Sequence, residues 1–154
     1  MKKIILACVL LISSFGFANA QTSGAQSEKN AIGLRIGWGA EASYQRFLNN
    51  GNRIEADLGL DWGGGINVAG AYQWVFDLSA LSPGFNWYVG PGVALGLWDK
   101  NFAVGIIGSI GIEYNFAIPL QLSLDWRPGF YLNTGNSNFN FGYTGFALGV
   151  RYRF

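Results

Sequence analysis

The sequence predicts an all-β protein, an eight-stranded antiparallel up-and-down transmembrane β-barrel built from residues 31–154. Side chains of alternating character recur along about eight segments of the chain. Half of the 154 residues are hydrophobic and only 12% are charged, yet no long uninterrupted apolar run follows the first 20 positions. A helical span needs about 20 such residues. A membrane protein without one must be a closed barrel, because its backbone polar groups have to be paired within the protein.

The alternation is clearest between Phe102 and Phe116, where bulky apolar residues alternate with Ala, Gly, Ser, Glu and Asn. Alternation alone also fits a soluble barrel with an apolar interior. Size separates the two possibilities, because an eight-stranded barrel encloses only a few layers of side chains. We therefore expect the bulky set to face lipid. Its members outside this segment are Ile32, Leu34, Ile36, Trp38, Ile54, Leu58, Leu60, Trp74, Phe76, Phe85, Trp87, Leu95, Leu97, Leu122, Leu124, Trp126, Phe146, Leu148, Val150 and Tyr152.

Eight strands are predicted in this pattern. They cover residues 31–39, 42–48, 53–62, 66–78, 85–98, 102–116, 120–132 and 141–154. Turn-forming residues separate them, as at Asn49–Asn52 and Pro83-Gly84, because Asn and Gly tolerate positive φ and proline presets a turn.

Two features leave the strand pattern open. In the second strand, either Ala42, Tyr44 and Leu48 or Phe47 could face outward. The fifth strand contains Gly90-Pro91-Gly92, and its proline lacks the N–H that the ladder needs. We therefore expect a β-bulge there.

The chain begins with a pattern typical of a secretory signal peptide. Lys2 and Lys3 precede an apolar stretch from Ile4 to Ile12, and Ala18-Asn19-Ala20 matches a small-residue cleavage site. The alternative, a transmembrane anchor, is disfavoured because the stretch is short and polar residues follow it. The sequence thus predicts a signal peptide over residues 1–20 and a location in the bacterial cell outer membrane.

Residues 21–30 are polar and without periodicity, so they are predicted to form a flexible periplasmic lead-in to the barrel. Cys8, the only cysteine, lies in the predicted signal peptide. The exported chain would then have neither a disulfide nor thiol chemistry.

Charged residues of both signs share the inward-facing positions. In a narrow lumen that lipid insulates from water, unpaired charge is costly, whereas arginines and carboxylates can satisfy one another. Glycines at many inward positions leave room for these long side chains. We predict an interior charge network that plugs the lumen, made by Arg35, Arg53, Glu55, Asp57, Glu113, Asp125, Arg127, Arg151 and Arg153, with Asp61 and Asp77 at positions of the same parity.

Composition excludes several function classes. The chain has no histidine, so a Ser-His-Asp triad or an Asp-His pair cannot form, and no metal-ligand cluster is present. We expect no enzyme, no cofactor and no metal. The net charge of +1 and the lack of a basic patch argue against a nucleic-acid partner. Glu55, Asp57 and Asp125 are the remaining acid–base candidates for a lipid-acting enzyme.

Aromatic residues lie mostly near the predicted strand ends. That placement is typical of the girdles at the two membrane–water interfaces, and a platform for a sugar or a hydrophobic ligand is the alternative. The aromatic residues concerned are Trp38, Trp62, Trp74, Trp87, Trp98, Trp126, Tyr131, Tyr143, Tyr152 and Phe154.

Three segments carry a resemblance to a known group. They are the alternating strand Thr144–Phe154, which ends Arg151-Tyr152-Arg153-Phe154, together with Leu124–Pro128 and Gly111–Tyr114. The chain resembles the small OmpA/OmpX-type outer-membrane β-barrels, in particular the compact ones of Bacteroidetes-like bacteria. In such families the terminal phenylalanine is part of the signal read by the barrel assembly machinery. The resemblance therefore implies this role for Phe154, with the assembly machinery and periplasmic chaperones as partners during biogenesis.

The chain departs from both namesakes of that group. It lacks the peptidoglycan-binding domain of the OmpA type and the long protruding strands and loops of the OmpX type, so wall anchoring and adhesion do not carry over. The sequence favours a non-enzymatic structural barrel in contact with outer-membrane lipid. A narrow channel for ions or small solutes is the alternative, and a lipid-acting enzyme or a soluble ligand-binding barrel is less favoured.

Overall fold

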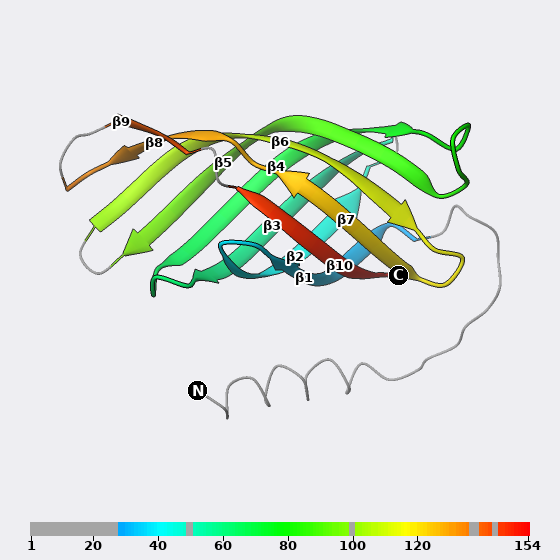
Figure 1. Ribbon diagram of the computed structural model, residues 1–154, viewed down its shortest axis with the longest axis horizontal. Helices are drawn as coiled ribbons and strands as arrows, with labels where there is room; N and C mark the ends of the chain where they lie inside the picture. Colours follow the sequence, from blue (N-terminus) through cyan, green and yellow to red (C-terminus); the bar gives the residue numbers. More distant parts are fainter. Residues whose placement is uncertain (1–27, 49–50, 99–100, 136–138, 143–144) are drawn as a thin grey trace, which may run out of the picture.

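The computed structural model describes residues 28–48, 51–98, 101–135, 139–142 and 145–154, so the predicted signal peptide and most of the lead-in lie outside the described residues. Ten β-strands form one antiparallel sheet (Figure 1). They are β1 (Asn30–Ile36), β2 (Gly39–Phe47), β3 (Asn52–Asp61), β4 (Ile66–Asp77), β5 (Phe85–Trp98), β6 (Asn101–Asn115), β7 (Leu120–Trp126), β8 (Gly129–Asn133), β9 (Phe139–Gly142) and β10 (Phe146–Arg153).

The sheet closes into an eight-stranded antiparallel barrel, which confirms the predicted all-β class, strand number and barrel closure. Each strand from β1 to β6 pairs with its neighbours in sequence, and β6 pairs with both β7 and β8. Strands β7 and β8 therefore make up one barrel strand, and β9 and β10 make up another. The ring is completed where β10 pairs with β1, from Ala31 opposite Arg153 to Ile36 opposite Leu148.

The two faces of the barrel are divided as the alternation predicts. Large apolar side chains point outward and remain exposed, as for Ile32 at 50% and Leu58 at 58%. The most completely buried large side chains are mainly polar or charged, and they include Arg53, Arg151 and Glu55. The molecule thus has a polar interior and an apolar surface, the reverse of an ordinary water-soluble domain.

The structure settles the phase of the second predicted strand. Ala42, Tyr44 and Leu48 face outward, whereas Ser43 and Gln45 are buried in the lumen. The same phase turns Glu41 inward, since residues alternate across a strand. Glu41 therefore joins the lumen, although the sequence pattern left it unassigned.

The predicted bulge at Gly90-Pro91-Gly92 is wrong. The register of β5 with β4 is the same on both sides of Pro91, from Ala71 opposite Gly92 to Trp74 opposite Val89. The ladder is only interrupted there, because the proline has no N–H to donate.

A register shift occurs instead in the last two barrel strands. Two residues separate Trp126 from Gly129, whereas three separate their partners Phe146 and Gly142. The outward positions accordingly change parity, from Phe139 and Phe141 in β9 to Phe146 in β10. This shift lies beside Arg127, whose N–H donates to the Gly145 carbonyl at 3.0 Å.

The barrel wall is uneven in height. β5 and β6 have 14 and 15 residues, whereas β1 has seven. In Figure 1, β5, β6, β8 and β9 extend past the turn that joins β1 to β2. We call this end, which carries the β1–β2 and β3–β4 turns, the loop end. The opposite end, where Asn30 and Phe154 exchange backbone hydrogen bonds of 3.0 and 2.8 Å, is the terminal end.

Cysteine labelling tests this division of faces. With Cys8 replaced by alanine, Leu124→Cys should react rapidly with N-ethylmaleimide in the folded protein, because Leu124 is exposed on the outer face. Ser123→Cys should be protected, because Ser123 is buried in the lumen. Mass spectrometry measures the reaction, and unfolding in urea should make both cysteines reactive. Equal reactivity of the two folded variants would contradict the assigned faces.

Candidate functional site

Arg127 is the central cation of the lumen. It follows β7 and precedes Pro128, and its side chain crosses the lumen to β3. There its Nη2 contacts Glu55 and lies 2.7 Å from Oδ2 of Asp57. Its Nη1 lies 3.4 Å from Oε2 of Glu41. One guanidinium thus joins carboxylates of β2 and β3 to the opposite wall of the barrel.

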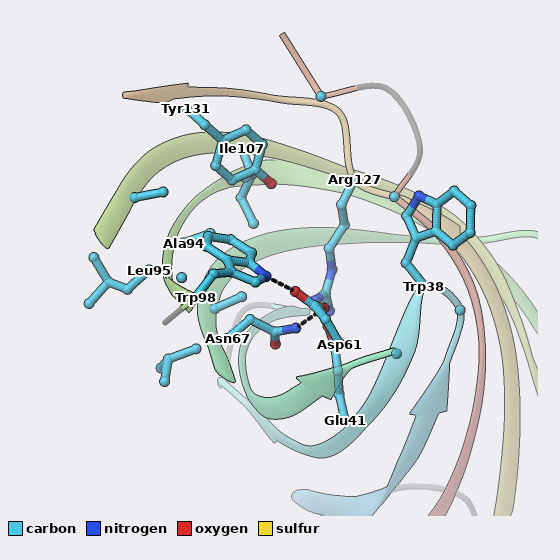
Figure 2. Close-up of a pocket in the computed structure, with 18 of the residues that line it drawn as sticks. Trp38, Glu41, Asp61, Asn67, Ala94, Leu95, Trp98, Ile107, Arg127 and Tyr131 are labelled. Carbon is cyan, nitrogen blue, oxygen red and sulfur yellow. Dashed lines mark hydrogen bonds and ion pairs between the residues drawn. The ribbon is translucent and has the colours of Figure 1, made fainter. Parts of the chain in front are cut away.

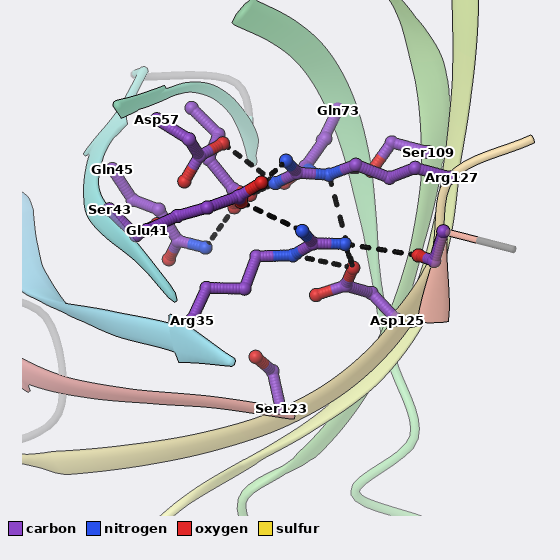
Figure 3. Close-up of polar contacts among 12 residues, drawn as sticks. Arg35, Glu41, Ser43, Gln45, Asp57, Gln73, Ser109, Ser123, Asp125 and Arg127 are labelled. Carbon is purple, nitrogen blue, oxygen red and sulfur yellow. Dashed lines mark hydrogen bonds and ion pairs between the residues drawn. The ribbon is translucent and has the colours of Figure 1, made fainter. Parts of the chain in front are cut away.

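Arg35 of β1 forms the second part of this cluster (Figure 3). Its Nε donates to Oδ1 of Asp125 at 2.9 Å, and its Nη2 contacts the same oxygen. Its Nη1 donates to Oε2 of Glu41 at 2.8 Å. Glu41 therefore bridges Arg35 and Arg127, and together the two arginines contact carboxylates from β2, β3 and β7.

Arg151 of β10 lies deeper in the lumen. Its Nε donates to the Ser43 hydroxyl at 2.9 Å, and its Nη1 donates to the Ser123 hydroxyl at 2.7 Å. Its Nη2 lies 3.4 Å from Glu55. A Cβ on Gly149 would meet the Arg151 guanidinium at 2.6 Å, so that glycine provides the space the guanidinium occupies.

Arg53 of β3 has its own partners nearer the terminal end. Its guanidinium is paired with Glu113 and also donates to Gln73. The same guanidinium lies 4.2 Å from the centroid of the Tyr88 ring, within range of a cation–π interaction. Gln73 in turn donates to the Ser109 hydroxyl at 2.8 Å. This layer is fully buried and is held across β3, β4, β5 and β6.

The structure therefore brings together eight of the nine residues predicted for the network and leaves Arg153 out. Arg153 ends β10 at the terminal end, where its Nη2 donates to the Phe116 carbonyl at 2.8 Å and its Nη1 lies 3.2 Å from Glu28. Asp77 is also outside the lumen, because its carboxylate accepts the Ser79 N–H at 2.7 Å in an exposed turn. Both residues have inward parity but lie past the end of the lumen.

The sequence analysis did not assign several lumen residues to the charge network, because most carry no formal charge and Glu41 lies in the strand whose phase was open. They are Glu41, Ser43, Gln45, Gln73, Tyr88, Ser109, Gln121 and Ser123. For most of them, the sequence did indicate the inward orientation, because their positions alternate with those of the outward-facing residues. Tyr88, which is completely buried, alternates with the outward-facing neighbours on β5 and so carried the same signal.

The loop end of the lumen is hollow. A cavity of about 540 Å³ lies there, within the range of small-molecule sites. Figure 2 shows Trp98, Asn67, Asp61, Glu41 and Arg127 among the residues that line it. Several inward residues of the long strands β4, β5 and β6 are small at this end, as at Ala69, Ala94 and Ala103, and so leave this space open.

Two aromatic residues that were expected in the outer girdles line this cavity instead. The Trp98 indole N–H donates to Asp61 at 2.9 Å, and Tyr131 of β8 lines the cavity two strands away from β5. A Cβ on Gly96 would collide with the Trp98 ring, and one on Gly105 would meet the Tyr131 ring at 2.5 Å. Gly96, two residues before Trp98 on β5, and Gly105, on the strand next to Tyr131, thus make room for the two rings. Tyr143 lies outside the described residues.

The acid–base candidates do not reach the cavity. Glu55, Asp57 and Asp125 are 3% exposed or less, and each is paired with an arginine. Among the described residues, none of these three lines the cavity, so a substrate held there would not touch them. The described residues also contain no group of three or more His, Cys, Asp and Glu side chains suited to a metal ion.

Comparison with protein-family models, with curated proteins and with solved structures found no match. In the described part of the chain, no helix has the length and apolar character to cross a membrane.

Arg127→Leu tests the network. The substitution leaves Glu55 and Asp57 without their Arg127 contacts, and uncompensated buried charge costs about 3–5 kcal/mol. We expect the urea unfolding midpoint, followed by tryptophan fluorescence in detergent, to fall accordingly. Arg46→Leu is the matched control, because Arg46 is exposed on the outer face of β2, and its midpoint should change little. Equal midpoints for the two variants would contradict the central role of Arg127.

Gly111→Val tests whether the glycines provide room. A Cβ there would meet the Tyr88 phenol ring at 2.6 Å, so the ring would have to leave its place beside Arg53. We expect a clearly lower unfolding midpoint. Gly63→Val is the control, because a Cβ at Gly63 would have no neighbour within 4 Å. A Gly111 variant as stable as the Gly63 variant would show that Tyr88 is not tightly packed.

Proposed function

We propose that this protein is a non-enzymatic integral outer-membrane β-barrel with a structural role, its lumen plugged by side chains over most of its length. The observation that carries the proposal is the apolar outer face of a closed barrel that has charged residues inside. Exposed apolar surface of this extent is rare on monomeric proteins in water. It is the outward band expected of a barrel in lipid.

The dimensions of the barrel support this proposal. A tilted strand needs about 9–11 residues to cross the hydrocarbon layer. β2, β3 and β4 have 9, 10 and 12 residues. β7 and β8 together supply a similar length, and so do β9 and β10 together. Apart from Arg46 on β2, the outward residues along these strands are largely apolar, as at Leu58, Leu124 and Leu148.

Charge pairing supports a plugged lumen. The described lumen holds four arginines, at positions 35, 53, 127 and 151, each within 4 Å of at least one of five carboxylates. Ions could pass only if these pairs separated, and separating buried pairs is costly. The layer formed by Arg53 and Glu113 is completely buried, so it blocks the lumen toward the terminal end.

The proposal extends to biogenesis. Residues 1–20 direct export, the compact OmpA/OmpX-type resemblance gives the class of barrel, and Phe154 carries the assembly signal. Phe154 is 52% exposed and its N–H donates to the Asn30 carbonyl at 2.8 Å. Its side chain is therefore accessible to the barrel assembly machinery, with periplasmic chaperones acting earlier and outer-membrane lipid surrounding the finished barrel.

Fractionation and gel mobility test the membrane proposal. The expressed protein should be recovered in the outer-membrane fraction. Without boiling, it should migrate differently from the boiled sample on a detergent gel, because closed barrels of this kind resist detergent. Recovery in the periplasm without detergent would contradict the proposal and favour a soluble ligand-binding barrel.

A narrow channel is the second candidate, and the open cavity at the loop end favours it. Planar-bilayer recordings of the purified protein separate the two functions. We expect no steady conductance from the wild type, because the Arg53 layer closes the lumen. Steady, reproducible openings would overturn the plugged-lumen proposal. Lipid turnover that is lost in Asp125→Asn would instead indicate an enzyme.

A further inference from the structure

The cavity at the loop end is more than residual space above the network. It combines an apolar wall with a small number of polar groups, the usual composition of a small-molecule site. Ala94, Ala103 and Ile107 supply the apolar part, and Trp98 and Tyr131 supply two aromatic rings. Glu41 and Asp61 face this wall from β2 and β3 (Figure 2).

Asp61 differs from the other carboxylates of the lumen. Its two oxygens accept neutral N–H groups, from Asn67 at 2.8 Å and from Trp98 at 2.9 Å. Every other lumen carboxylate has an arginine within 4 Å, whereas no arginine or lysine among the described residues lies that close to Asp61. Asp61 is thus held in place, with its negative charge still available to a cation.

The charge of the cavity floor also favours a cation. Arg35 and Arg127 line the floor, but both are already engaged by carboxylates behind them. Across the lumen, four arginines face five paired carboxylates, and Asp61 adds a further negative charge. The excess charge of the described lumen is therefore negative, and an anionic ligand would have to displace an existing carboxylate.

Unsatisfied polar atoms occur among the residues that line the cavity. Oδ1 of Asn67 is buried and accepts no hydrogen bond from the described residues. Nε of Arg127, a side chain 6% exposed, likewise donates no hydrogen bond within the described chain. A buried polar atom without a partner normally signals water or a ligand. The Asn67 oxygen, next to Asp61, is free to accept a hydrogen bond from an N–H or O–H donor.

We infer that this cavity binds a primary organic ammonium with an apolar or aromatic body. The ammonium group donates to Asp61 and Asn67 in charge-assisted hydrogen bonds, near Glu41. The apolar body lies against Ile107, the alanines and the Trp98 ring. The inference goes beyond the structural role proposed above and requires neither conduction nor insertion into a membrane.

Calorimetric titration of the folded protein tests the inference. The protein is kept in a nonionic maltoside detergent, because zwitterionic detergents would add competing ammonium groups. The probe is 2-phenylethylammonium, with 2-phenylethanol as a neutral match of similar shape and 3-phenylpropanoate as an anionic one. We expect saturable binding of one equivalent of the ammonium only. Equal binding of the alcohol or preferential binding of the carboxylate would overturn the inference.

Variants assign the binding to this cavity. Asp61→Asn keeps the shape of the side chain and should weaken affinity by about tenfold or more. Asp77→Asn is its control, because Asp77 is the exposed last residue of β4 and lies outside the lumen, and it should bind as the wild type does. Trp98→Leu should weaken binding, whereas Trp74→Leu, on the outer face, should not.

Folding of each variant is checked by the gel shift between unboiled and boiled samples, so that loss of binding is not confused with loss of structure. A folded Asp61→Asn variant with wild-type affinity would overturn the inference, as would no saturable binding by the wild type at millimolar probe. Neither result would affect the proposed membrane location, which fractionation tests separately.

Discussion

Charge neutralisation across the lumen is the constraint on which the rest of this structure depends. Arg127 and Arg35 join the wall formed by β1, β2 and β3 to the wall formed by β7, because each guanidinium contacts carboxylates from both sides. Long charged side chains can meet in this way only if neighbouring positions are small, as Gly149 is beside the Arg151 guanidinium. With the interior filled by polar groups, the bulky apolar residues have only the outer face to occupy.

This inverted arrangement relates the fold to the proposed function. A polar interior and an apolar exterior are stable together where the surroundings are hydrocarbon, since burial of apolar surface is then provided by lipid. The uneven wall adds a second feature. The long strands β5 and β6 carry small inward residues beyond the last arginine layer, and this leaves a recess at one end of an otherwise filled cylinder.

The sequence predicted the fold more completely than the site. Period-two alternation was sufficient to assign the faces and eight barrel strands, and it identified the arginines at positions 35, 53, 127 and 151. It did not place Glu41, because the second strand allowed two phases. It also could not separate Trp98 and Tyr131 from girdle residues, because an aromatic side chain near a strand end has the same spacing whether it turns outward or into the lumen.

The sequence by itself determined which side of the sheet most residues occupy, because a strand alternates its side chains whatever its neighbours are. Only the tertiary structure decided which charges meet. The contacts of Arg127 with Glu55, Arg35 with Asp125 and Arg151 with Ser43 join residues 72, 90 and 108 positions apart. Such pairs form across a closed ring, and their identity depends on the register of every strand between them, including the one-residue shift beside Arg127.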